Sequence, residues 1–204
     1  MSRLILHGSL RSNFVRTCLL VLNEKEVDFE HDPTDPQTPE ALQLHPWGKI
    51  PALTHGEVLL YETLAITNYI DDSFSGPKLK PNNPSKLALM NKWLSIYLCY
   101  MDNPIIRVIV IQRLLSKSPD ENLIQNTIPD AEKPLKILDE CLEKSNYIVD
   151  SEVSLADFLI LPALDSLKMT NEGVQLLKDT TNINSWIDRM MERESSKIVL
   201  KPNN

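Results

Sequence analysis

The sequence predicts an α+β N-terminal domain followed by an all-helical C-terminal domain. Up to residue 73, short apolar strand patterns alternate with amphipathic helix patterns. A segment rich in proline and glycine follows, and beyond Pro84 the apolar residues recur at helical spacing throughout. We therefore expect one domain over residues 1–75, a linker over 76–84 and a helical domain over 85–204.

The N-terminal domain is expected to follow the order β-α-β-α-β-β-α. Strands are expected at residues 4–6, 27–31, 52–54 and 58–61, and helices at 14–23, 40–44 and 63–73. Val15, Cys18, Leu19 and Leu22 fall on one face of the first helix. Gly56 supplies the turn between the last two strands.

The C-terminal domain is expected to consist of helices only. A long helix follows Pro84, and Pro104 should kink or interrupt it. Further helices are expected at residues 123–145, 155–167 and 183–194, with a tail at 197–204. Ser154 and Asp157 form a capping box before the almost wholly apolar third helix, which should therefore lie at the centre of the domain.

Composition excludes several classes of function. The 204 residues carry 28 acidic and 21 basic side chains, for a formal net charge of −7, which argues against a nucleic-acid partner. The longest uncharged apolar run is too short to cross a membrane, and the N-terminus leads straight into a strand pattern, so no signal peptide is expected. The three scattered cysteines are typical of a reduced cytoplasmic protein, and the four histidines lack metal-ligand spacing.

One stretch with two prolines and a glycine, His45 to Leu53, has the character of a ligand-binding loop. If the Ile50–Pro51 bond is cis, Ile50 turns its backbone N–H and C=O outward toward an extended peptide. Just after this loop, Thr63 offers a hydroxyl and free N–H groups to a carboxylate at a helix start, and Glu62 can pair with an ammonium group. Glutathione is a peptide of this kind.

These residues carry a family resemblance. H-P-W-G-K-I-P-A-L followed by L-Y-E-T-x-A-I-x-x-Y-I resembles the cytosolic glutathione transferases, whose usual forms are N-P-x-G-x-V-P-A-L and E-S-x-A-I. The S-x-A-D-F sequence that starts at Ser154 is a second point of likeness. The resemblance implies a thioredoxin-like N-terminal domain, an all-α C-terminal domain, and a cytoplasmic homodimeric enzyme. It would use glutathione and a small hydrophobic electrophile as substrates, with neither membrane nor nucleic-acid partner.

The resemblance also implies a serine that holds the glutathione sulfur as a thiolate. A phi-like pattern, G-x-x-x-S-x-x-x-R, matches Gly8, Ser12 and Arg16, so Ser12 is the first candidate. Ser9 is the second, because delta and theta patterns place the serine earlier. The alternative is that Ser12 only caps the helix, and one serine can do both. Cys18 lies inside the helix and is expected to be a buried apolar residue rather than a nucleophile.

Further site residues follow from the same likeness. Glutathione would lie against Lys49, Ile50, Pro51, Glu62 and Thr63. The electrophile pocket would involve Leu10, Arg11, Tyr97, Tyr100 and Arg107, and no metal is expected. The chain departs from the phi pattern at residues 36–40, where a cation for the glycyl carboxylate is missing, and Arg11 is a candidate substitute.

Three functions remain open from the sequence. The first is conjugation of glutathione to an electrophile, with peroxide reduction as a related activity. The second is a non-catalytic binding or scaffold role on the same fold, which the missing cation favours. The third is a glutathione-dependent isomerase or dehalogenase, although the serine- and cysteine-rich loop of such relatives is absent.

Overall fold

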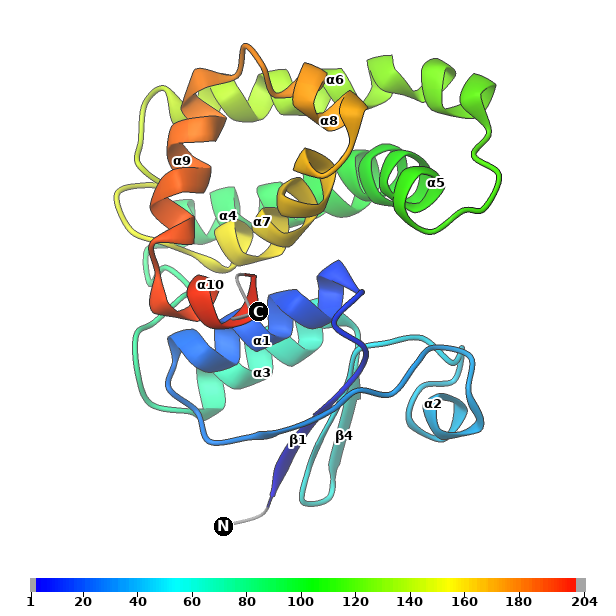
Figure 1. Ribbon diagram of the computed structural model, residues 1–204. Helices are drawn as coiled ribbons and strands as arrows, with labels where there is room; N and C mark the ends of the chain where they lie inside the picture. Colours follow the sequence, from blue (N-terminus) through cyan, green and yellow to red (C-terminus); the bar gives the residue numbers. More distant parts are fainter. Residues whose placement is uncertain (1–2, 201–204) are drawn as a thin grey trace. The chain divides into compact units, whose positions relative to one another are not determined.

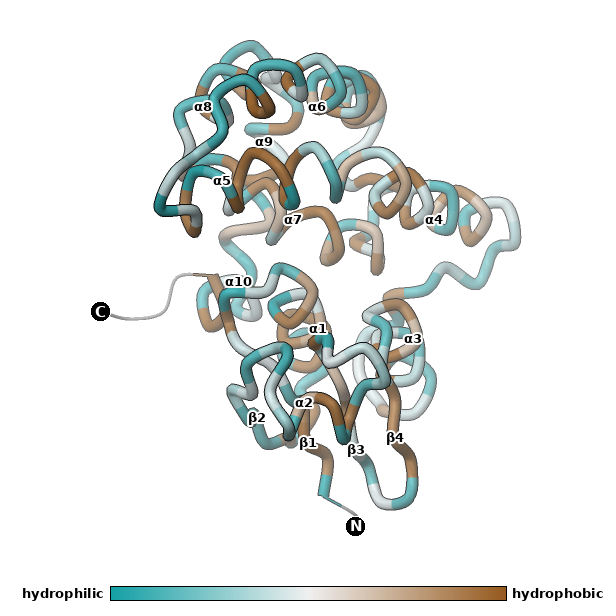
Figure 2. Tube along the Cα trace, turned by 90° about the vertical axis from the view of Figure 1, so that its right-hand side faces the viewer, coloured by the Kyte–Doolittle hydropathy of each residue, from teal (hydrophilic) through white to brown (hydrophobic). Residues whose placement is uncertain are grey.

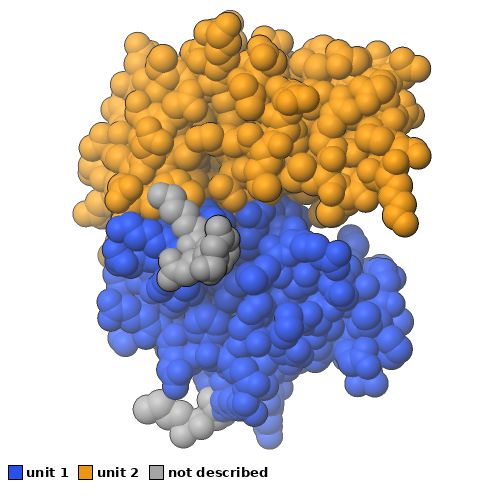
Figure 3. All heavy atoms as spheres, viewed as in Figure 1, with its two compact units in different colours: residues 1–79, 193–204 blue, residues 80–192 orange. Residues whose placement is uncertain are grey.

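The computed structural model describes residues 3–200, and the chain divides into two compact units. Unit 1 contains residues 1–79 and 193–204, and unit 2 contains residues 80–192 (Figure 3). The predicted thioredoxin-like and helical parts are therefore both present, but the helical part ends at residue 192 rather than at the C-terminus.

Unit 1 is built on a four-stranded mixed sheet in the order β2-β1-β3-β4. Its elements are β1 (Leu4–His7), α1 (Asn13–Glu24), β2 (Glu30–Asp32), α2 (Pro39–Leu44), β3 (Ala52–His55), β4 (Val58–Tyr61), α3 (Thr63–Ser73) and α10 (Glu194–Val199). Strands β1 and β2 are parallel, whereas β1 with β3 and β3 with β4 are antiparallel. This is the predicted element order up to α3, with Gly56 at the β3–β4 turn in a positive-φ conformation.

Helices α1 and α3 lie side by side over the sheet, and α10 packs on α1 (Figure 1). All four residues predicted for the core face of α1 are buried, and so are Leu20 and Val21. Both faces of α1 are covered because the helix has α10 as well as α3 and the sheet as neighbours. From the sequence, the region of α10 is predicted only as the end of a helix followed by a tail. Residues 201–204 of that predicted tail lie outside the described residues.

The second strand is shorter than the sequence predicts. Of the expected residues 27–31, only Glu30 and His31 belong to β2. Pairing with β1 begins at the Ile5–Glu30 register, so residues 27–29 lie before the ladder starts. Strand length is set here by the neighbouring strand, which an alternating pattern alone does not reveal.

The first part of the predicted linker is packed into unit 1. Lys25 Nζ lies 3.2 Å from Asp71 Oδ1 and 3.0 Å from the Pro77 carbonyl oxygen, and both side chains of this ion pair are 0% exposed. The backbone N–H of Leu79 donates to the same Asp71 oxygen at 2.9 Å. The boundary therefore falls after residue 79 instead of residue 75, because a buried charge pair holds the segment in place.

Unit 2 is helical over its described elements. These are α4 (Pro84–Ile96), the π-helix η1 (Tyr97–Val110), α5 (Ile111–Leu114), α6 (Glu121–Leu142), α7 (Leu155–Lys168), α8 (Asn171–Leu176) and α9 (Thr181–Met191). Helix α7 packs against α4, η1 and α8, and its trace is largely apolar (Figure 2). It is the predicted central helix, with Ile160, Leu161 and Leu164 at 0% exposure.

The helix continues through Pro104 instead of being interrupted. Residues 97–110 adopt π-type hydrogen bonding, as in the bond from the Ile111 N–H to the Ile106 carbonyl. Proline lacks an N–H and clashes with the carbonyl four residues earlier, and a wider helical register accommodates both effects. By length and hydropathy the helix at 84–114 is long and apolar enough to span a membrane, a test that core helices of soluble proteins also pass, and 50% of its most apolar window is buried inside the protein.

Two features at the end of unit 2 differ from prediction. Helix α8 is only six residues long, too short for a periodic signal, and was not expected. Its Gly173 lies so close to α7 that a Cβ there would stand 1.8 Å from the Leu167 carbonyl oxygen. The last predicted helix, 183–194, corresponds to α9, which ends at Met191, and most of α10 lies beyond it, where a tail was expected, and belongs to unit 1.

Candidate functional site

The loop after β1 meets the proline loop at Gly8. This glycine has φ +147°, and a Cβ at this position would lie 2.4 Å from Val15 Cγ2 and 3.2 Å from Ile50 Cβ. Only glycine fits such a close approach. The segment that carries the candidate serines is therefore held directly beside Ile50.

Histidines from β1 and β2 fix the end of β1. His7 Nδ1 lies 2.9 Å from Asp32 Oδ2, and His7 Nε2 lies 3.1 Å from Thr54 Oγ1. Hydrogen bonds from His7 and then from Thr34 lower the pKa of the Asp32 carboxyl. His31 Nε2 lies 2.7 Å from the Gly8 carbonyl oxygen. These contacts join three strands under the loop, and sequence analysis gave no signal for them because the partners are far apart in the chain.

Ser12 is the N-cap of α1. Its Oγ accepts a hydrogen bond from the Val15 N–H at 3.4 Å, and its own N–H donates to the Ser9 carbonyl at 3.0 Å. The capping role predicted as an alternative is thus present. A hydroxyl that accepts such a bond still has its proton to donate, and it stands at the positive end of the helix.

The other residues of this loop are more exposed. Arg11 pairs with Asp35 at 2.7 Å, and its Nε donates to Ser9 Oγ at 3.4 Å. The Arg11 charge is therefore already matched by a carboxylate, which speaks against Arg11 as the missing cation. Leu10 is 48% exposed.

The Ile50–Pro51 peptide bond is cis, which is the condition that the sequence-based interpretation of this loop required. Pro51 is buried, Ile50 is half-buried and Lys49 is exposed. The loop is held from residue 37: Gln37 Nε2 donates to the Trp47 carbonyl at 2.9 Å, and the Gln37 N–H donates to the Gly48 carbonyl at 2.8 Å. Sequence analysis noted only the lack of a cation in this stretch and missed the role of Gln37.

Glu62 and Thr63 stand at the start of α3, as predicted. Glu62 is the N-cap with φ +71° and ψ +118°, a conformation that costs a non-glycine residue free energy and that clusters at functional sites. Its side chain is 68% exposed, whereas Thr63 is only 6% exposed. Of these two side chains, that of Glu62 is thus the one exposed to solvent.

The three remaining predicted residues lie in unit 2. Tyr97 is 0% exposed and its hydroxyl donates to Asp102 Oδ1 at 3.3 Å, so the structure does not support it as a pocket residue. Arg107 Nε donates to Asp102 Oδ2 at 2.9 Å, and Tyr100 is 66% exposed. The ring of Tyr97 serves the core because it sits on the buried face of the π-helix.

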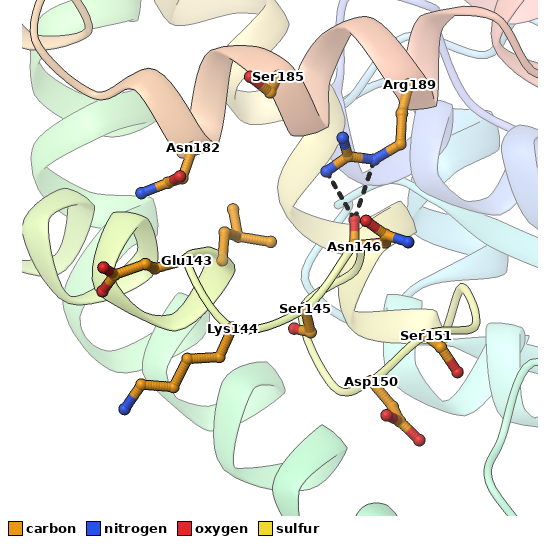
Figure 4. A pocket seen from close by; sticks show the side chains of 10 residues that line it. Glu143, Lys144, Ser145, Asn146, Asp150, Ser151, Asn182, Ser185 and Arg189 are labelled. Atoms are coloured by element: carbon orange, nitrogen blue, oxygen red, sulfur yellow. Dashed lines mark hydrogen bonds between the residues drawn. The ribbon is translucent and has the colours of Figure 1, made fainter.

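Among the cavities lined by described residues are two within unit 2, and neither of these is lined by a predicted site residue. One has a volume of about 410 Å³ and opens between the end of α6, the loop that follows it and α9 (Figure 4). There the Arg189 guanidinium donates to the Asn146 carbonyl oxygen at 3.0 and 3.2 Å. The other, of about 700 Å³, lies between α6 and α8.

Cys18 is fully buried, and burial raises the pKa of its thiol far above the ordinary value, which agrees with the predicted apolar role. Within residues 3–200, no group of three or more His, Cys, Asp or Glu side chains is arranged to hold a metal ion.

Comparison with known proteins gives the same family for both units. Residues 6–78 match the family model of the glutathione S-transferase N-terminal domain, and residues 85–194 match that of the C-terminal domain. Glutathione S-transferase 3 from Zea mays is 31% identical over 206 residues, covering 95% of this chain and 91% of the maize protein.

Solved structures agree with these matches. The crystal structure of poplar glutathione transferase F1 is 28% identical, with a TM-score of 0.89 and 98% of each chain covered. A structure of glutathione S-transferase-I bound with lactoylglutathione is 25% identical, with a TM-score of 0.86 and coverage of 98% of this chain and 99% of the other. The family models alone cover well over half of the sequence, and the chain belongs to the glutathione S-transferase family.

Proposed function

We propose that this glutathione S-transferase activates the sulfur of glutathione with the hydroxyl of Ser12. The observation that carries the proposal is the position of Ser12, which caps α1 while the turn at Gly8 brings its loop beside Ile50. A free thiol titrates at about 8.5, so the site must favour the anion by roughly one to two pKa units at neutral pH. A hydroxyl donor together with the positive end of a helix favours the anion in this way.

Glutathione would lie along the backbone of Ile50, next to Pro51. Its γ-glutamyl ammonium would meet the exposed carboxylate of Glu62, and its γ-glutamyl carboxylate the N-terminus of α3 at Thr63. Lys49 is exposed and is the nearest candidate in this loop for the glycyl carboxylate. The lactoylglutathione bound to the related glutathione S-transferase-I supports a glutathione-type ligand for this fold.

In the reaction, the thiol proton leaves to solvent and the thiolate forms a new S–C bond with a small hydrophobic electrophile. In a substitution, the electron pair of the broken bond departs with the leaving group. When the electrophile is an activated double bond, the π electron pair moves away from the attacked carbon, and the anion that forms takes up a proton from solvent. Tyr100 and Arg107 remain candidates for the electrophile pocket, with Leu10 and Arg11. The proposal also includes reduction of organic peroxides by the same thiolate. It further includes a cytoplasmic location and a homodimer, as is general in the family.

A non-catalytic binding role is the second candidate. It is favoured by one observation, namely that residues 36–40 bring no cation and that Arg11, the substitute, is paired with Asp35. Such a protein would bind glutathione without turning over an electrophile. Glutathione-agarose retention measured alongside turnover of a generic electrophile separates the two candidates.

Replacing Ser12 tests the mechanism. Ser12→Ala should lower conjugation at neutral pH by about one to three orders of magnitude, with the KM for glutathione little changed. The pH profile of kcat/KM should move to higher pH, because the bound thiol loses a donor that stabilises its anion. Unchanged turnover would transfer the role to Ser9, which Ser9→Ala then tests.

Loss of the helix cap needs its own control. Ser12→Ala also removes the bond to Val15, which costs about 0.5–2 kcal/mol of stability. Thr38 caps α2 in the same unit through a bond from the Ala41 N–H at 3.2 Å. Thr38→Ala should therefore show a similar loss of stability with turnover and pH profile unchanged.

A further inference from the structure

His45 lies at the start of the proline loop and contacts the candidate glutathione site without belonging to the predicted set. It is 3% exposed. Its ring stands 4.7 Å from the ring of Tyr61 and 5.8 Å from that of Trp47, measured between centroids. The imidazole is therefore one of three mutually contacting aromatic rings, since the Trp47 and Tyr61 rings lie 6.3 Å from each other, and this packing restricts its orientation.

Hydrogen bonding fixes the tautomer of this histidine. His45 Nδ1 accepts the backbone N–H of Trp47 at 3.2 Å, so in the neutral ring the hydrogen sits on Nε2. Burial lowers the pKa of His45 below its ordinary value, with Glu62 opposing and Lys49 adding to the effect. Protonation would also require giving up the bond from Trp47. The ring is thus neutral at pH 7, with Nε2–H as its one donor.

The Glu62 carboxylate lies near that donor. His45 Nε2 is 3.9 Å from Glu62 Oε1, longer than a hydrogen bond, so a change of Glu62 rotamer has to bring the two groups within hydrogen-bond distance. The Glu62 side chain itself is 68% exposed and has no capping bond to α3. An exposed glutamate samples many rotamers, and a donor fixed on one side favours those that bring the carboxylate toward it. The backbone of Glu62 is already confined to a positive-φ conformation.

We propose that His45 is a positioning residue for Glu62: its Nε2–H holds the carboxylate in place to receive the ammonium group of the γ-glutamyl end of the ligand. This rests on the proposed function, since the ammonium is that of glutathione.

The substitution His45→Asn removes the donor at Nε2 while it keeps an acceptor in place of Nδ1. The asparagine Oδ1 can accept the Trp47 N–H in place of Nδ1, so the loop keeps its bond, whereas the donor toward Glu62 is lost. The expected result is a rise of about threefold in KM and Kd for glutathione, the size of a partly exposed polar interaction, with kcat unchanged. His45→Gln, which restores an N–H near the position of Nε2, should recover most of the affinity.

A second ligand distinguishes positioning from a general loss of structure. The probe is des-amino glutathione, which lacks the α-ammonium group and should bind wild type and His45→Asn equally well. In a double-mutant cycle with Glu62→Gln, adding His45→Asn should cause no further loss of glutathione affinity. As a control, His55→Asn removes a histidine whose Nδ1 bonds Tyr69 at 2.8 Å at the far end of β3, and it should leave both affinities unchanged.

The outcomes are distinct. Equal losses for glutathione and the des-amino analogue, or additive losses in the cycle, would overturn the role of His45. If Glu62→Gln weakens glutathione binding and His45→Asn does not, the positioning role fails while the proposed function stands. If wild type does not bind glutathione in calorimetry, the proposed function fails and the positioning role fails with it.

Discussion

At the residue scale, Glu62 carries the clearest conflict between stability and function. Its φ of +71° with ψ +118° lies in a region that glycine adopts readily and other residues do not. Such a conformation costs about 1–3 kcal/mol and persists only where the surrounding structure imposes it. A glutamate kept at this cost, with its carboxylate exposed, is best explained by what the carboxylate binds.

Replacing this residue by glycine should therefore stabilise the protein. Glu62→Gly relieves the strain but adds the backbone entropy cost of glycine, about 0.5–1 kcal/mol, so the expected net gain is between zero and about 2 kcal/mol. Urea unfolding measures the change. Under the proposed function the same variant loses affinity for glutathione, which titration calorimetry detects.

Glu57 offers a matched comparison. It is exposed, lies beside the β3–β4 turn and is not among the described residues with positive φ. Glu57→Gly should destabilise by about 0.5–1 kcal/mol with glutathione affinity unchanged. If both glycine variants lose stability equally, the strain at Glu62 is not an energetic cost.

At the element scale, the N-terminus of α7 is organised by one buried carboxylate. The predicted capping box is present, with the Ser154 N–H donating to Asp157 Oδ2 at 2.8 Å. Asp157 Oδ1 also accepts the Ile148 N–H at 3.0 Å and the Trp186 indole N–H at 2.9 Å. Burial raises the pKa of the Asp157 carboxyl, and these donors oppose the rise. The carboxylate thus joins the start of α7 to α9 and to the loop that precedes α7.

Removing this acceptor should be costly. Asp157→Ala leaves three buried N–H donors without their partner, and we expect a loss of about 3–5 kcal/mol in the free energy of unfolding. Asp157→Asn keeps one acceptor oxygen and should lose less. Asp188→Ala, at an exposed aspartate of α9, is the control and should stay within about 0.5 kcal/mol. A small effect of Asp157→Ala in chemical denaturation would mean that water replaces the carboxylate at no cost.

At the scale of the whole molecule, α10, which follows the helices of unit 2 in the sequence, belongs to unit 1. Arg193, just before α10, pairs with Glu24 at the end of α1, and Ser195 Oγ donates to Glu24 Oε2 at 2.8 Å. These partners are 169 and 171 residues apart. The Glu24 side chain is 10% exposed, so these donors take the place of most of the water that would otherwise hydrate it.

This contact should support the stability of unit 1. Arg193→Ala leaves a largely buried carboxylate without its cation, and we expect a cost of about 1–3 kcal/mol. For a chain of this length that lowers Tm by about 2–4 °C per kcal/mol. Lys197→Ala, which removes an exposed partner of Glu194, should change Tm much less. Equal shifts in a thermal scan would show that the Glu24 pair adds nothing beyond a surface ion pair.

Much of the candidate site could be predicted because its signals are local. The cis bond before Pro51, the Ser12 cap and the acid-hydroxyl pair at the start of α3 each depend on a few neighbouring residues. The contacts of His45 with Glu62 and of Arg11 with Asp35 could not, because they join loops that only the folded sheet brings together. The burial of Tyr97 could not be predicted for a related reason: helical spacing gives a face, but not what covers it.

The sequence by itself determined the order of strands and helices in unit 1, the central apolar helix with its capping box, and the family. Periodicity, capping and proline geometry act within a few residues, so they can be read along the chain. The tertiary structure alone decided that α10 belongs to unit 1, that residues 76–79 are packed by a buried ion pair, and that the helix passes Pro104 in π register. The first two features depend on the burial of charges and surfaces by partners distant in sequence, and burial is a property only the folded chain has. The third accommodates the missing N–H and the clash at Pro104, for which the sequence leaves an interrupted helix and a wider register equally open.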